Sequence, residues 1–222
     1  MTREPLSEQG SESSVFASVE DAVAAIARGE IIVVVDDEDR ENEGDLIMAA
    51  GAASAETITF FVRHTSGVIC APLTGERLDE LEIPLMVRDN TESHRTAFTY
   101  SVDYVHGTST GISAADRAAT IQALIDPATR PADLARPGHI FPLRYSEGGV
   151  LKRAGHTEAA VDLARLAGMD PAGVLCEIVN DDGTMARVDD LVPYCARHGL
   201  KMVTVADLIA YRRRHDKLVE RV

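Results

Sequence analysis

An acidic segment at residues 36–45 constrains this chain more than any other feature. Seven of its ten residues carry a carboxylate, and it lies between two apolar stretches, residues 31–35 and 46–50, that are typical of buried strands. Because strands anchor both of its ends, the segment can direct its side chains into a cleft. Clustered carboxylates repel one another unless a cation shares the site, so Mg²⁺ or a similar hard ion is the expected counter-charge. The alternative is a solvated acidic loop.

The rest of the chain alternates helical and extended patterns without an internal repeat. Ser18 and Ser113 are each followed three residues later by an Asp, a capping pattern that predicts helix starts. We expect helices over residues 18–29, 54–63, 113–126 and 157–167 and from residue 206, and strands over residues 31–35, 46–50, 68–71, 96–102, 174–179 and 202–205. This alternation favours one α/β or α+β domain with a mixed sheet covered by helices. Residues 1–14 are expected to be a flexible N-terminal tail, and residues 15–222 the folded domain.

Composition excludes several classes of function. The chain has 22 Lys and Arg against 36 Asp and Glu, a net charge of −14 at pH 7 that repels nucleic-acid backbones. No apolar run approaches the roughly 18 residues of a membrane span, and the polar N-terminus does not resemble a secretion signal. Three cysteines without a CxxC pair favour reduced thiols. We therefore expect a cytoplasmic protein without nucleic-acid or membrane partners.

A second candidate site is the sequence RAGHTE at residues 153–158, which leads into an amphipathic helix. A helix N-terminus has free N–H groups and a partial positive charge, and both attract anions. Gly155 lets a ligand approach the backbone, Arg153 suits a phosphate, and His156 could coordinate a metal beside it. Alternatively, Thr157 is an ordinary N-cap and His156 an exposed loop residue.

Three further features are weaker when taken alone. Glu177 interrupts the apolar stretch at residues 174–179, where a carboxylate is rarely buried without a partner. That partner could be an Arg, or Glu177 could be a titrating catalytic group. His139 follows a Pro-Gly turn, where a structural hydrogen bond is its ordinary role. The sequence HGTSTG at residues 106–111 has the composition of a phosphate-binding turn but lacks the Lys and spacing of a Walker loop.

Seven motifs, in order, resemble the 3,4-dihydroxy-2-butanone 4-phosphate synthase (DHBP synthase) family of riboflavin biosynthesis. They are DDEDRENEGDLI, HTSGVIC, TAFTYSVD, GISAADRA, RPGHIFPL, RAGHTEAAVDLARLAG and LCEIVNDDGTMAR. The resemblance implies an α+β fold with three layers, α/β/α, around a mixed sheet. It implies a lyase that converts D-ribulose 5-phosphate to L-3,4-dihydroxy-2-butanone 4-phosphate and formate. It also implies Mg²⁺ or Mn²⁺, two ions per active site, and a homodimer with the site near the subunit interface.

The resemblance also assigns individual residues. Glu41 and His156 are implied as metal ligands, and the implied catalytic residues are Glu41, Asp45, His139 and Glu177. The implied substrate-binding residues are Arg40, Glu41, Asp45, Arg153, Ala154, Gly155, His156, Thr157 and Glu177. The chemistry agrees, since enediol formation and skeletal rearrangement call for carboxylate and imidazole acid–bases and for a metal that stabilises an enediolate.

Two other functions fit the same residues. A metal-dependent isomerase or aldolase would act on a sugar phosphate without releasing formate, and a non-catalytic metal-binding module would bind no sugar phosphate. In the family the domain is often fused to a GTP cyclohydrolase II, and the charged C-terminal residues resemble the start of such a fusion. The zinc-binding cysteines of that second activity are absent, so we expect no action on GTP.

Overall fold

A mixed seven-stranded sheet forms the centre of the structure, a computed structural model that describes residues 15–216. The strands are β1 (Ile32–Val35), β2 (Gly44–Ala49), β3 (Cys70–Leu73), β4 (Val102–Tyr104), β5 (Leu134–Arg144), β6 (Gly173–Glu177) and β7 (Lys201–Thr204). Their order is β4-β5-β3-β6-β2-β1-β7. The β1–β7 and β3–β5 pairs are parallel, and the other neighbours are antiparallel. The predicted tail at residues 1–14 lies outside the described residues.

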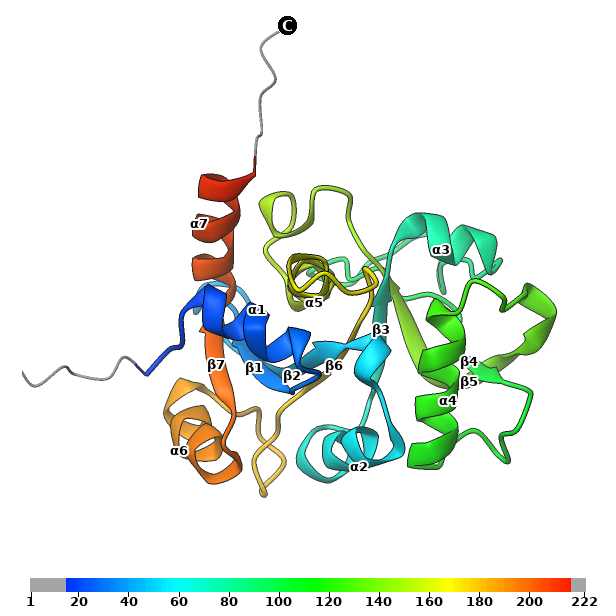
Figure 1. Ribbon diagram of the computed structural model, residues 1–222, viewed down its shortest axis with the longest axis horizontal. Helices are drawn as coiled ribbons and strands as arrows, with labels where there is room; N and C mark the ends of the chain where they lie inside the picture. Colours follow the sequence, from blue (N-terminus) through cyan, green and yellow to red (C-terminus); the bar gives the residue numbers. More distant parts are fainter. Residues whose placement is uncertain (1–14, 217–222) are drawn as a thin grey trace, which may run out of the picture.

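Helices cover both faces of this sheet (Figure 1). On one face lie α1 (Val19–Ala27), α5 (His156–Leu166) and α7 (Val205–His215); on the other lie α2 (Ala55–His64), α4 (Ala114–Ile125) and α6 (Val188–His198). The short α3 (Gly75–Glu80) follows β3. Successive strand residues point to opposite faces, so Val34 packs with the first group of helices and Val33 with the second. The predicted three-layer α+β fold is confirmed.

Local sequence signals placed most elements correctly. Ser18 and Ser113 cap α1 and α4, and each side chain accepts a hydrogen bond of 3.0 Å from the backbone N–H three residues on. Among the described helices, none is long and apolar enough to cross a bilayer.

The strand predicted over residues 96–102 is largely wrong. Only Val102 at its end belongs to a strand, β4, while Phe98 and Thr99 form isolated bridges. Phe98 bridges Leu143 of β5 and Thr99 bridges Leu85; next to Leu143 stands Pro142, which accepts a hydrogen bond from the N–H of Thr99 but lacks the N–H that a continuous ladder requires. The alternating pattern therefore describes an extended segment that pairs only intermittently.

Candidate active site

The acidic segment is a tight loop organised by Asp36, the residue that follows β1. Its buried carboxylate accepts hydrogen bonds from the backbone N–H groups of Glu41 (3.1 Å) and Glu43 (2.9 Å) and from Nη1 of Arg40 (2.8 Å). Arg40 also pairs with Glu41 at 2.5 Å. Charge-assisted bonds of this kind hold the loop in one shape. The sequence analysis did not single out Asp36, although its place as the first acid after a buried strand was an available signal.

Two strands, a loop and a helix bring the next residues together. The β2–β6 register sets Asp45 opposite Glu177, and α5 begins above this row with His156. The two ring nitrogens of His156 face two carboxylates: Nδ1 lies 3.5 Å from Oε2 of Glu41, and Nε2 lies 3.8 Å from Oδ1 of Asp45. His156 is only 6% exposed, so the alternative of an exposed loop histidine is wrong.

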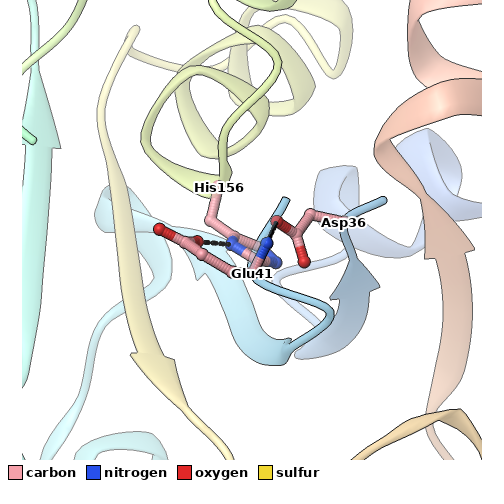
Figure 2. A group of neighbouring side chains, drawn as sticks. All are labelled: Asp36, Glu41 and His156. Atoms are coloured by element: carbon pink, nitrogen blue, oxygen red, sulfur yellow. Dashed lines mark hydrogen bonds and ion pairs between the residues drawn. The ribbon is translucent and has the colours of Figure 1, made fainter. Parts of the chain in front are cut away.

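Figure 2 shows Asp36 and Glu41, from the β1–β2 loop, meeting His156 at the start of α5. Their potential ligand atoms lie within 4.8 Å of one another. Among the described residues, Oδ1 of Asp45 and Nε2 of His156 are buried atoms that have no hydrogen-bond partner, an arrangement that is costly unless a ligand completes it. Carboxylate oxygens suit Mg²⁺ or Mn²⁺, and an imidazole nitrogen is a common ligand of transition-metal ions. The residues present therefore fit a divalent ion, and because Asp36 uses both oxygens within its loop, Glu41 and His156 are the better ligands.

The same packing shifts the pKa values of Asp45, His156 and Glu41. Burial raises the pKa of Asp45 to about 8, and the nearby carboxylates of Glu177 and Glu41 add to this effect. Burial alone would lower the pKa of His156, but Asp45 and Glu41 outweigh it and raise that pKa to about 9. Burial would raise the pKa of Glu41, but His156 and Arg40 outweigh it and lower that pKa to about 2. A cation at this position would take over the role of the proton on His156.

Two guanidinium groups converge on the start of α5. Gly155 is the N-cap and makes no side-chain cap, so Thr157 lies inside the helix and is not its N-cap. A Cβ built on Gly155 would lie 2.5 Å from Nη1 of Arg153 and 3.1 Å from Nη2 of Arg40. An uncapped helix N-terminus between two Arg side chains is suited to a phosphate.

Arg153 is itself held by three partners. Nη1 donates to Oε2 of Glu158 (2.7 Å), and Nη2 donates to Oγ1 of Thr96 (2.9 Å) and to the carbonyl of His94 (3.2 Å). Glu158 is 1% exposed, so its carboxylate depends on this contact. Glu158 was absent from the predicted set because its partner is visible only in the fold.

A single cavity collects most of the predicted residues. It is lined by Arg40, Glu41, Asp45, Arg153, His156, Thr157 and Glu177, together with Glu43 and Cys70, which the sequence analysis did not select. Ala154 and Gly155 belong to the same backbone stretch. The partner of Glu177 is not an Arg but Ser66, whose hydroxyl donates to Oε2 at 3.0 Å.

His139 does not line this cavity and comes from a different strand, β5. Cys70 of β3 pairs with Phe141 of β5 and with Leu175 of β6, so β5, which carries His139, lies two strand spacings or roughly 10 Å from β6, which ends at Glu177. Nδ1 of His139 lies 2.7 Å from Oδ2 of Asp103, and its backbone N–H donates to Oδ1 at 2.8 Å. The imidazole is 41% exposed.

The sequence HGTSTG does not join the cavity. His106 instead lies 2.9 Å from Oδ1 of Asp133, and the segment leads to the cap of α4. This segment is therefore better described as a loop that leads into a capped helix than as a phosphate-binding turn.

Known proteins give a consistent comparison. The sequence pattern of the family described as 3,4-dihydroxy-2-butanone 4-phosphate synthase matches residues 20–211. A 3,4-dihydroxy-2-butanone 4-phosphate synthase of Agrobacterium fabrum is 60% identical, over 88% of this chain and 92% of the relative. The riboflavin biosynthesis protein RibBA of Salinispora arenicola is 60% identical over 94% of this chain, which spans 50% of that relative's length.

A solved structure of a 3,4-dihydroxy-2-butanone 4-phosphate synthase in complex with two magnesium ions superposes with a TM-score of 0.87. It shares 47% identity and covers 90% of this chain and 98% of its own. Family pattern, relatives and fold agree over nearly the whole chain. The chain therefore belongs to the 3,4-dihydroxy-2-butanone 4-phosphate synthase family, and the enzyme class predicted from the sequence, a DHBP synthase of riboflavin biosynthesis, is confirmed.

Proposed function

We propose that this chain converts D-ribulose 5-phosphate to L-3,4-dihydroxy-2-butanone 4-phosphate and formate in the cavity beside the start of α5. One observation carries the proposal: Glu41, Asp45 and Glu177 meet His156 in a cavity that also contains two guanidinium groups. The reaction needs a phosphate anchor, a divalent metal and acid–base groups in one place. The residues that line this cavity suit all three needs.

The phosphate end of the substrate is assigned to the start of α5. Arg40 and Arg153 converge there, and the backbone of Ala154, Gly155 and Thr157 completes the anion site. A phosphate bound at this point leaves the sugar carbons over the β2–β6 row. Asp45 and Glu177, which pair in that row, are proposed to contact the hydroxyls of the substrate.

Glu41 and His156 are proposed to hold Mg²⁺ or Mn²⁺, with two ions per active site. The bound metal polarises the carbonyl oxygens of the substrate and stabilises its enediolate. The two buried atoms that have no hydrogen-bond partner, on Asp45 and His156, support this assignment. Of the chain's own groups, Glu177 and His139 move protons at the substrate carbons, and Asp103 holds His139 in one orientation.

We also propose that the protein is a homodimer with the site near the interface. Leu85, Met86, Val87 and Tyr100 are each more than 40% exposed, and the backbone N–H of Tyr100 donates to the carbonyl of Pro84, so these exposed apolar side chains come from two neighbouring segments. Groups of exposed apolar side chains mark interaction surfaces. Light scattering at micromolar concentration tests this proposal, and an active monomer of 24 kDa would contradict it. We propose the cytoplasm as its location, although two Arabidopsis thaliana relatives are described as chloroplastic.

The deciding experiment is incubation with carbon-13-labelled ribulose 5-phosphate and Mg²⁺, followed by NMR. Formate and a four-carbon phosphate are expected in equal amounts. An isomerase or aldolase would convert the substrate without formate, and a metal-binding module would leave it unchanged. Either outcome would contradict the proposed reaction.

A further inference from the structure

Helix α5 carries two buried carboxylates that the proposed chemistry does not use. Glu158 and Asp162 lie one turn apart on the same face and are 1% and 3% exposed. A buried carboxylate is costly unless it is paired and fully hydrogen-bonded. Their partners therefore identify what these two residues hold in place.

Both carboxylates bind the segment that leads from β5 to the start of α5. Glu158 accepts from the backbone N–H of Ser146 (3.2 Å) and from Arg153 (2.7 Å). Asp162 accepts from the hydroxyl of Tyr145 (3.0 Å) and from the backbone N–H of Val150 (2.8 Å). The segment is thus fixed at its beginning, its middle and its end, where Arg153 enters the cavity.

Helix α7 also binds this segment, in the region where both lie beside α5 (Figure 1). Nη1 of Arg212 donates to Oδ2 of Asp162 (2.7 Å) and to the carbonyl of Gly148 (2.9 Å). Gly149 has φ +62°, and a Cβ built on it would lie 2.3 Å from Asp162 and 2.5 Å from Nη1 of Arg212. This close approach leaves no room for a side chain at position 149. Helix α5, helix α7 and the segment between β5 and α5 are therefore packed against one another.

We propose that Arg212 is a positioning residue for the phosphate end of the substrate, acting through Asp162 and the segment that ends at Arg153. The inference rests on the proposed function, since it assumes that Arg153 binds a phosphate. Without Arg212, the charge of Asp162 loses its cationic partner and the segment loosens around Gly148. Turnover should change little, because Asp45 and Glu177 come from β2 and β6, whereas the hydrogen bonds of Arg212 go to Gly148, Asp162 and Asp216.

The test compares Arg212→Met with Arg213→Met, a matched change at an exposed arginine on the same helix. With saturating Mg²⁺, the first variant should raise KM for ribulose 5-phosphate, and Ki for inorganic phosphate as a competitive inhibitor, by about tenfold, with kcat within twofold. The second should match the wild type in all three constants. Arg212→Lys keeps the charge beside Asp162 and should restore most of the phosphate affinity.

Unchanged KM and Ki in folded Arg212→Met would overturn the inference, as would a loss confined to kcat. If that variant does not fold, Tyr145→Phe decides: it removes one donor to Asp162 and should raise Ki for phosphate about threefold, and an unchanged Ki rejects the inference. Failure of the proposed function looks different, because the wild type itself would then release no formate. In that case, calorimetric titration with inorganic phosphate would still compare the phosphate affinity of the wild type with that of the variant.

Discussion

Asp45 and Glu177 face each other across the β2–β6 ladder, so two carboxylates that are far apart in the sequence share one row of the sheet. Their surroundings differ. Asp45 is 2% exposed and lies under His156, whereas Glu177 is half-buried and accepts a hydrogen bond from Ser66. The row thus pairs a carboxyl that is buried beside the proposed metal ligands with one that is more exposed to the cavity.

Removal of either proposed metal ligand should abolish turnover without unfolding the protein. Glu41→Ala leaves Arg40 paired with Asp36, so the loop keeps its shape. We expect Glu41→Ala and His156→Ala each to weaken Mg²⁺ binding by about 10²-fold or more. Calorimetric titration measures the Mg²⁺ affinity, and formate release measures the turnover. Glu38→Ala, an exposed acid of the same loop, is the control and should behave as wild type; full activity in excess EDTA would contradict the assignment.

Metal affinity should rise with pH. The pKa of His156 is raised to about 9 in the metal-free protein, and a metal binds only the unprotonated imidazole. Between pH 6.5 and 9 the apparent Kd for Mg²⁺ should therefore fall, by up to about tenfold per pH unit. Titrations in buffers of different ionisation enthalpy should show proton release, and a Kd that is constant over this range would rule out the mechanism.

The stability of the metal-free protein should change in the opposite direction. The pKa values of Asp45 (about 8) and His156 (about 9) are both raised above their unfolded values of 3.8 and 6.5. The native state thus binds more protons than the unfolded state, and stability falls as the pH rises towards 9. In EDTA, the Tm should decrease from pH 6.5 to 9. Asp45→Asn cannot ionise and leaves His156 with less negative charge, so its Tm should vary less over the same range.

The sequence predicted the acidic loop and many of the helices and strands because these depend on local patterns, whereas the three layers followed only from the family resemblance. Caps at Ser18 and Ser113, apolar strands and a helix start expected at Thr157, one residue after the observed start at His156, are all read from a few neighbouring residues. The order of the strands is not local, because it depends on how crossovers pack. Pairs such as Glu177 with Ser66, or His139 with Asp103, follow only from that order.

Glu177→Gln should separate chemistry from structure. Glutamine keeps the size of the side chain and can still accept the Ser66 hydrogen bond through its amide oxygen, but it cannot exchange a proton. We expect a Tm and Mg²⁺ affinity close to wild type, with formate release lowered by about 10²-fold or more. Ser66→Ala, which removes only the hydrogen-bond donor to Glu177, should lower formate release by a smaller factor. Near-normal turnover of the Gln variant would remove Glu177 from the mechanism.

Arg153→Lys should act on substrate affinity. Lysine keeps the charge beside buried Glu158 but cannot also donate to Thr96 as the guanidinium fork does. A phosphate contact made equally in the ground and transition states changes KM, so we expect KM to rise about tenfold with kcat nearly unchanged. Lys152→Met, at the exposed neighbouring cation, should leave both constants unchanged. A fall in kcat alone would assign Arg153 to the chemical step.

Asp103→Asn should impair His139 without removing it. In the wild type, Nδ1 of His139 lies 2.7 Å from Oδ2 of Asp103, which favours the tautomer with the proton on Nδ1 and leaves Nε2 free to accept one. An amide at position 103 can donate to Nδ1 and so favours the opposite tautomer, a change that costs about 10²- to 10⁴-fold in kcat where a histidine acts as a base. We expect such a loss per folded molecule, together with a changed pH–rate profile. The chain offers a matched control in His106 and Asp133, a second pair at 2.9 Å outside the cavity, so Asp133→Asn should leave the pH profile unchanged. Equal kinetic effects of the two variants would show that Asp103 supports only the fold.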